Sequence, residues 1–211
     1  MADWIRRTTW SQEDEAMFFK KLRRAWSHNR PQYLRIQAYN LYQTMNPDLL
    51  RVAESLLCKM LTEYSDAKYI RTEMAPGYEL LGRVCETLGE YDKSLLHYQN
   101  ALNAESAFPY SLTDAYLAYA ELVVRLQRVE MFSEIEQILL EREEQAFFPV
   151  QKYKRYIIMA IINKHRSNDA EADNYMMLAK QNADAVTSGF RYHKTLGLVA
   201  ETHRWLENLL K

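Results

Sequence analysis

Apolar residues recur along this chain at spacings of three and four positions in almost every window, a pattern typical of helices that each bury one face. The first such window opens at Ser11, where Asp14 completes a capping box, and extends to about Ser27. A second helix is expected from Pro31, since proline suits the first helical turn, and a third from Asn46. The pattern therefore predicts a succession of helices.

Turn and cap residues divide the rest of the chain into spans of about 15 to 25 residues. Helices of this length joined by short turns form antiparallel hairpins, so the chain is expected to be a series of helical hairpins. The breaks fall at Ser65-Asp66, Gly89, Phe108-Pro109, Phe148-Pro149, Ser167-Asn168-Asp169 and Ser188-Gly189.

Composition supports an all-α fold. The 211 residues include only 5 glycines and 5 prolines, too few for the tight turns of an all-β sandwich. The chain is 48% hydrophobic and 26% charged, with a formal net charge of −1, which argues against disorder and against a globally cationic nucleic-acid binder.

One 34-residue segment, 75–108, carries a repeat motif. Its pattern of aromatic, glycine and alanine positions resembles the tetratricopeptide repeat (TPR) family, with Cys85, Ser94 and Ser106 as departures. In this comparison Gly82 and Ala101 stand where two helices approach closely, and Gly89 permits a turn with positive φ. The matching positions are Tyr78, Leu81-Gly82, Gly89, Tyr91, Tyr98 and Ala101-Leu102.

Weaker copies of this unit are centred on Ala38, Ala120 and Ala160. The resemblance implies a right-handed superhelix, an α-solenoid of about four TPR-like antiparallel hairpins over residues 31–182, in a single domain spanning 1–211. Residues 1–30 would form an N-terminal capping helix. Residues 183–211 would form a loop and a C-terminal capping helix.

The resemblance also implies a concave groove, lined by the first helix of each hairpin, in which a partner polypeptide docks. The lining is mixed in sign and partly aromatic, unlike a uniformly basic clamp for acidic tails. Its apolar members, Leu117, Ile157 and Ile161, indicate that part of the groove is covered, either by the C-terminal segment of the chain or by an apolar partner. The family's lining positions fall on Gln32, Arg35, Tyr39, Tyr42, Pro76, Glu79, Arg83, Glu86, Asp114, Leu117, Glu121, Val124, Lys154, Ile157, Ile161 and Lys164.

A second candidate binding surface lies near the C-terminus, where the helical period breaks. Phe190, Arg191, Tyr192 and His193 are side-chain types favoured at binding hot spots. The alternative is a loop whose aromatic residues pack over the last hairpin. Both interpretations stay open.

No catalytic or metal-binding constellation emerges from the sequence. No two of the five histidines have the i, i+4 spacing of paired metal ligands, and five scattered glycines cannot form a phosphate-binding loop. Cys58 and Cys85 have apolar neighbours and are expected to be small buried hydrophobes. The chain is therefore expected to have no enzymatic activity, no cofactor and no small-molecule substrate.

Charge is unevenly distributed. Residues 1–36 hold eight basic and four acidic side chains, interleaved with Trp4, Trp10, Trp26 and Tyr33. Such a region could stack on and neutralise RNA, or it could be an amphipathic capping helix with its basic side outward.

These observations favour a non-catalytic protein-interaction module. The alternatives are a bacterial immunity-type inhibitor that neutralises a toxin by direct binding, and an RNA-binding helical repeat protein. No apolar run of about 18 residues or signal-peptide core is present, so a cytoplasmic location without membrane association is expected. The residues expected to contact a partner are Arg35, Tyr39, Tyr42, Arg83, Glu86, Glu121, Arg191, Tyr192 and His193.

The repeat assignment predicts the effect of Ala101→Arg. The larger side chain would overpack a helix contact and bury a charge, which should lower the free energy of unfolding by at least several kcal/mol. Thermal denaturation followed by circular dichroism measures this. A melting temperature near that of the wild type would mean that the repeat is misassigned.

Overall fold

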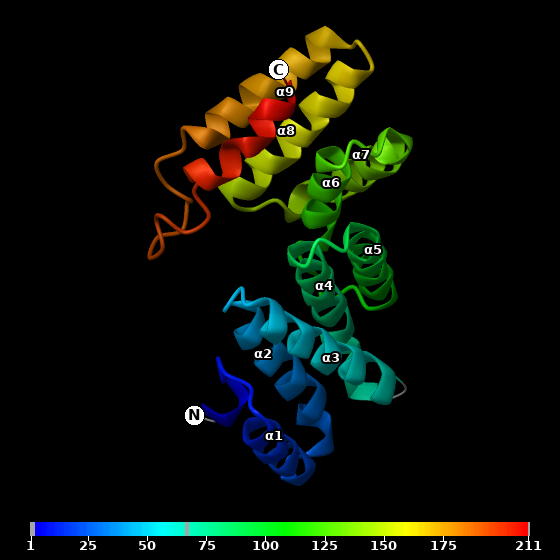
Figure 1. The fold of residues 1–211 in the computed structure, drawn as a ribbon. Helices are drawn as coiled ribbons and strands as arrows, with labels where there is room; N and C mark the ends of the chain where they lie inside the picture. The colour runs from blue at the N-terminus through cyan, green and yellow to red at the C-terminus, as the bar shows by residue number, and fades with distance from the viewer. Residues whose placement is uncertain (1–2, 66–67, 211) are drawn as a thin grey trace. The chain divides into compact units, whose positions relative to one another are not determined.

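The computed structural model describes residues 3–65 and 68–210, so the predicted break at Ser65-Asp66 lies partly outside the described residues. The described residues form helices and connecting segments without a strand, which confirms the all-α prediction (Figure 1). The α-helices are α1 (Gln12–Arg24), α2 (Arg30–Tyr42), α3 (Pro47–Glu63), α4 (Arg71–Thr87), α5 (Tyr91–Ala107), α6 (Ala115–Arg125), α7 (Phe132–Glu141), α8 (Pro149–His165) and α9 (Asp169–Ala183). The 3-10 helices are η1 (Asp3–Ile5), η2 (Ser27–Asn29), η3 (Lys68–Ile70), η4 (Val129–Met131), η5 (Glu143–Gln145) and η6 (Glu201–Leu210).

Two helix starts follow the predicted chemistry. Ser11 caps α1: its hydroxyl accepts the Asp14 N–H at 3.1 Å, while the Asp14 carboxylate accepts the Ser11 N–H at 3.0 Å. The side chain of Asn46 accepts the N–H groups of Asp48 and Leu49 at the start of α3. Among the described residues, no helix is long and apolar enough to cross a membrane.

The chain divides into two compact units, Met1–Ala115 (the first unit) and Tyr116–Lys211 (the second unit). The assignment of residues 1–211 to a single domain stays a prediction.

The first unit contains two hairpins, α2 with α3 and α4 with α5, and α3 also packs against α4. Arg35 of α2 pairs with Glu73 of α4, and further along both helices Tyr42 lies near Arg83. Because later positions of α2 meet later positions of α4, the first helices of the two hairpins run in the same direction. The hairpins are thus arranged in tandem.

The α4–α5 hairpin closes on Gly82. A Cβ atom at this residue would lie 2.6 Å from two carbons of the Tyr98 ring, so the ring occupies the space that a side chain would need. The Ser94 hydroxyl donates to the Gly82 carbonyl at 2.8 Å, and Ala101 is fully buried one turn beyond Tyr98. Gly89 has φ +78° in the turn between the helices, which confirms the predicted conformation.

Pro76 lies inside α4, because the helix begins at Arg71, four residues before the predicted repeat. Proline has no N–H to donate to the carbonyl of Thr72. The Ser111 hydroxyl donates to that carbonyl at 2.9 Å, so the loop after α5 replaces the missing helical hydrogen bond.

The second unit is built around α8, whose central residues are almost entirely buried. Helix α9 packs along α8, with Tyr156 and Tyr175 stacked at 6.2 Å between ring centroids. The buried Arg155 donates to the Leu139 carbonyl of α7 at 2.9 Å, and Tyr119 of α6 donates to Glu134 of α7 at 3.0 Å. The C-terminal η6 also lies against α8 (Figure 1).

A matched pair of substitutions in α4 tests the packing at Gly82. Gly82→Ala should lower the free energy of unfolding by about 1–3 kcal/mol, because the new methyl group meets a buried ring. Gly77→Ala is the control: its Cβ would meet the end of the flexible Met60 side chain, and alanine gains up to about 1 kcal/mol in helix propensity. Urea denaturation should rank Gly82→Ala as clearly less stable than Gly77→Ala, and the reverse order would contradict this packing.

Candidate functional site

The first unit brings several predicted groove residues to neighbouring positions on α2 and α4. Arg35 donates to Glu73 at 2.6 Å across the two helices, and Glu73 is buried. Because it is largely shielded from solvent, this ion pair holds the Arg35 guanidinium in one position more firmly than an exposed pair would.

Arg83 lies further along the same side of α4. Its guanidinium donates to Glu79 at 2.7 and 3.0 Å, and the Tyr98 hydroxyl donates to Glu86 at 2.7 Å. Burial disfavours the charge of Arg83, but Glu79 and the nearby phenol oxygens of Tyr98 and Tyr42 raise its pKa above the ordinary value. Arg83 and Glu86 thus belong to one fixed polar network.

Tyr39 and Tyr42 follow Arg35 on the same stripe of α2, four and seven positions later. Tyr42 is half-buried against the core of the first unit, whereas 49% of Tyr39 is exposed. No hydrogen bond within the described part of the chain engages the Tyr39 hydroxyl. The structure therefore gathers Arg35, Tyr39, Tyr42, Arg83 and Glu86 into one surface, which we call the α2–α4 face.

Glu121, which is also predicted to contact a partner in the groove, lies in the second unit. Lys154 of α8 donates to it at 2.7 Å, and both charges act on His203 of η6. Burial and the positive charge of Lys154 lower the pKa of His203. Glu121 thus lies close to the C-terminal segment.

The C-terminal segment covers part of α8. Leu206 of η6 is fully buried, and Tyr153 of α8 donates to Glu207 at 2.7 Å. Arg125 lies 5.7 Å from the centre of the Trp205 ring. The predicted apolar groove residues Leu117, Ile157 and Ile161 are all buried. In the second unit, the expected covering of the groove is therefore supplied at least in part by the chain itself.

The loop that precedes η6 has one aromatic residue packed on the last hairpin and three exposed residues that are free to form a binding surface. Phe190 stacks on Phe148 at 5.2 Å, and Phe148 also packs against Gly197, so this aromatic residue does pack over the last hairpin. Arg191, Tyr192 and His193 are exposed, Tyr192 to 81%, and the Arg191 guanidinium lies 5.3 Å from the Tyr192 ring centre. The three predicted contact residues thus protrude from a loop that Phe190 anchors.

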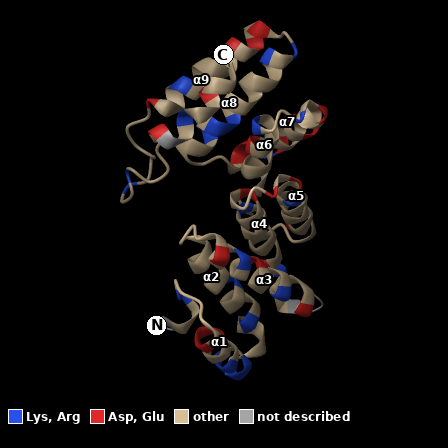
Figure 2. Cartoon of the chain, in the orientation of Figure 1, with Lys and Arg blue, Asp and Glu red and all other residues tan. Residues whose placement is uncertain are grey.

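The N-terminal aromatic residues are divided between core and surface. The rings of Trp4 and Trp10 lie 5.3 and 5.4 Å from that of the buried Phe18, whereas 75% of Trp26 is exposed. Helix α1 carries acidic residues in its first turn and basic residues in its last, where each sign complements the helix dipole (Figure 2). Trp26 is thus the exposed stacking surface among these three tryptophans.

The prediction that both cysteines are buried is wrong for Cys58, which is exposed, and right for Cys85. Leu57 and Met60 on either side of Cys58 face the core. Each helical residue is rotated about 100° from the one before, so apolar neighbours in sequence do not place Cys58 inside.

A cluster of Glu54, Cys85 and Glu90 has ligand atoms within 4.8 Å of one another. Arg51 donates to Glu54 at 2.8 Å and to Glu90 at 2.6 Å, and Lys93 pairs with Glu90 at 2.8 Å. Hydrogen bonds from Arg51 and Lys93 lower the pKa of Glu90 to about 2. Burial, Glu54 and Glu90 raise the pKa of the Cys85 thiol to about 12. Because the carboxylates already bind two cations and the thiol keeps its proton, this arrangement favours an ion-pair network over a metal site.

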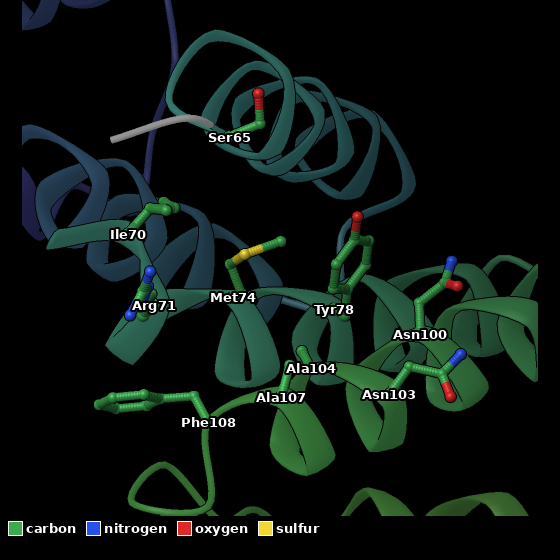
Figure 3. Close-up of a pocket in the computed structure, with 10 residues that line it drawn as sticks. All are labelled: Ser65, Ile70, Arg71, Met74, Tyr78, Asn100, Asn103, Ala104, Ala107 and Phe108. Atoms are coloured by element: carbon green, nitrogen blue, oxygen red, sulfur yellow. The ribbon is translucent and has the colours of Figure 1, made fainter. Parts of the chain in front are cut away.

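One hollow in the first unit contains none of the predicted contact residues (Figure 3). It has a volume of about 900 Å³ and lies between the end of α3, α4 and the second half of α5. The sequence did not predict this hollow, because Tyr78, its central aromatic residue, matches a position that packs the helices of the repeat together. The lining residues are Ser65, Ile70, Arg71, Met74, Tyr78, Asn100, Asn103, Ala104, Ala107 and Phe108.

Comparison with known proteins found no matching family model, curated protein or solved structure.

The contact of the C-terminal segment with α8 predicts the effect of Tyr153→Phe. Loss of the hydrogen bond to the Glu207 carboxylate should let residues 201–210 open more often, raising amide hydrogen exchange there roughly five- to tenfold. Exchange measured by mass spectrometry tests this, with Tyr192→Phe as the control because that hydroxyl is on the exposed loop. Equal exchange in both variants would show that the bond does not hold η6.

Proposed function

We propose that this protein is a non-catalytic interaction module that binds a partner polypeptide on the α2–α4 face, the part of a TPR-like groove that the first unit supplies. The observation that carries the proposal is the half-exposed Tyr39 on a stripe whose polar neighbours are already held in place. Exposed aromatic residues beside ordered polar groups are typical of binding hot spots.

The ion pairs on this face reduce the entropy that binding would cost. Arg35 is already paired with the Glu73 carboxylate, and Arg83 with the Glu79 carboxylate. A partner therefore does not have to immobilise two free arginine side chains. Remaining donor capacity on each guanidinium is available to carbonyl or carboxylate groups of the partner. The face thus combines an aromatic contact with prearranged donors.

Local packing supports the TPR-like part of the proposal. The four residues expected at close helix contacts, Ala38, Gly82, Ala120 and Ala160, are all buried. In the first unit, the first helices of successive hairpins also run in the same direction, as a tandem repeat requires.

The second unit is proposed to have a different share in binding. Because η6 lies on α8, the groove positions of the second unit are at least partly covered by η6. We therefore assign the main contact to the α2–α4 face of the first unit, and an accessory contact to the exposed loop residues Arg191, Tyr192 and His193 of the second unit.

The proposal predicts that the double variant Tyr39→Ala, Arg83→Glu loses its natural partner. Removal of the exposed ring and reversal of one charge should reduce recovery of the partner at least tenfold in a pull-down from the native cell, as expected for about 2 kcal/mol or more at a hot spot. Mass spectrometry identifies and quantifies the captured protein.

The matched control is Trp26→Ala, Arg24→Glu, which removes one exposed ring and reverses one exposed charge elsewhere in the first unit. This variant should recover the partner as the wild type does. Unchanged recovery by the Tyr39 and Arg83 variant would reject the α2–α4 face as the binding surface.

A further inference from the structure

The hollow over α4 lies on a different side of that helix from the α2–α4 face. Arg71, Met74 and Tyr78 follow one another at spacings of three and four positions and line the hollow. Glu79 and Arg83 point roughly 120° away around the helix axis, since successive residues are about 100° apart. The hollow is therefore a separate site within the first unit.

Small side chains on α5 create the space. Asn100, Asn103, Ala104 and Ala107 form one stripe of α5, and the two alanines leave room that longer side chains would fill. In Figure 3, Met74 and Tyr78 project from α4 into the space below the end of α3. The Tyr78 ring is stacked on His97 at 6.4 Å, which fixes the aromatic wall of the hollow.

Among the polar groups of the hollow, the Ser65 hydroxyl donates to the Thr62 carbonyl at 3.3 Å, whereas four others have no partner within the described part of the chain. Arg71 has no ion pair there, and the Asn100 and Asn103 carboxamides and the Tyr78 hydroxyl have no hydrogen bond there. Of the described residues that line the hollow, Arg71 alone is charged. The site thus offers one guanidinium, three groups that can each donate and accept, and an apolar surface from Met74, Ala104 and Phe108.

We propose that this hollow binds an extended segment of a partner polypeptide in which an Asp or Glu side chain lies close to an aliphatic or aromatic one. The carboxylate would pair with Arg71, and main-chain N–H and C=O groups would bond to Asn100 and Asn103. The apolar side chain would rest on Met74, Ala104 and Phe108. This inference rests on the proposed function and names the chemistry of a second contact with the partner.

The charge and the volume of the hollow support an acidic peptide segment as its ligand. The Arg71 guanidinium, the one charged group among the lining residues that the structure describes, matches an acidic group. A volume of about 900 Å³ lies near the upper end of ordinary ligand sites, which suits several linked residues better than a single small ion. Asparagine side chains suit main-chain amides because one carboxamide satisfies a donor and an acceptor together.

The test begins with selection of random heptapeptides, displayed on phage, against the full chain. Enriched peptides should pair an acidic residue with an apolar one. The most enriched peptide is then synthesised with blocked ends and a fluorescent label, and its binding is measured by fluorescence anisotropy. Arg71→Gln should weaken binding at least tenfold, and Ala104→Leu, which fills the hollow, should do the same.

Arg24→Gln is the matched control, because it makes the same change at an exposed arginine of α1 and should leave binding unchanged. Thermal denaturation shows that each variant is folded, and the exposed substitution Asn103→Leu provides a second variant should Ala104→Leu fail to fold. The inference is overturned if no peptide is enriched, if enriched peptides lack an acidic residue, or if Arg71→Gln binds as well as the wild type. Displacement of the peptide by succinate at equal concentration would also overturn it, in favour of a small-carboxylate site.

The pull-down with the Tyr39 and Arg83 variant separates this inference from the proposed function. If that variant loses the partner while no acidic peptide is selected, the hollow alone is rejected. If acidic peptides bind through Arg71 while that variant keeps the partner, the α2–α4 face alone is rejected.

Discussion

The seating of the Tyr98 ring over Gly82 is the contact on which the first unit depends. It sets how closely α5 approaches α4 and how α5 is rotated about its own axis. With that rotation fixed, the Tyr98 hydroxyl reaches Glu86 on one side of the hairpin. On another side, Asn100 and Asn103 line the hollow. The absence of a side chain at Gly82 thus determines the geometry of both the α2–α4 face and the hollow.

Local signals in the sequence predicted local structure well. Ser11 and Asn46 cap helices, and Gly89 takes a positive φ, because each outcome depends on a few neighbouring residues. The repeat motif begins at residue 75, whereas α4 begins at Arg71, so Pro76 lies inside the helix and not in its first turn. Its position inside the helix depends on Ser111, which is distant in sequence.

The candidate surfaces were predictable only in part, for a similar reason. A repeat motif indicated which side of α2 and α4 carries Arg35, Tyr39 and Arg83, but not that Glu73, 38 positions from Arg35, would hold its guanidinium. The hollow depends on which side chains are short along α5, together with where α3 ends. The periodic stripe of short and polar side chains on α5 does not show whether another helix covers it, and apolar periodicity likewise could not show that Cys58 is exposed.

The hydrogen bond from Ser111 to the Thr72 carbonyl has an evolutionary consequence. Pro76 leaves that carbonyl without its helical donor, and the hydroxyl of Ser111 supplies the replacement. A descendant of this chain that lost Ser111 would be under selection to restore an ordinary N–H at position 76, while one that lost Pro76 could dispense with the serine. The two positions are thus expected to change as a pair.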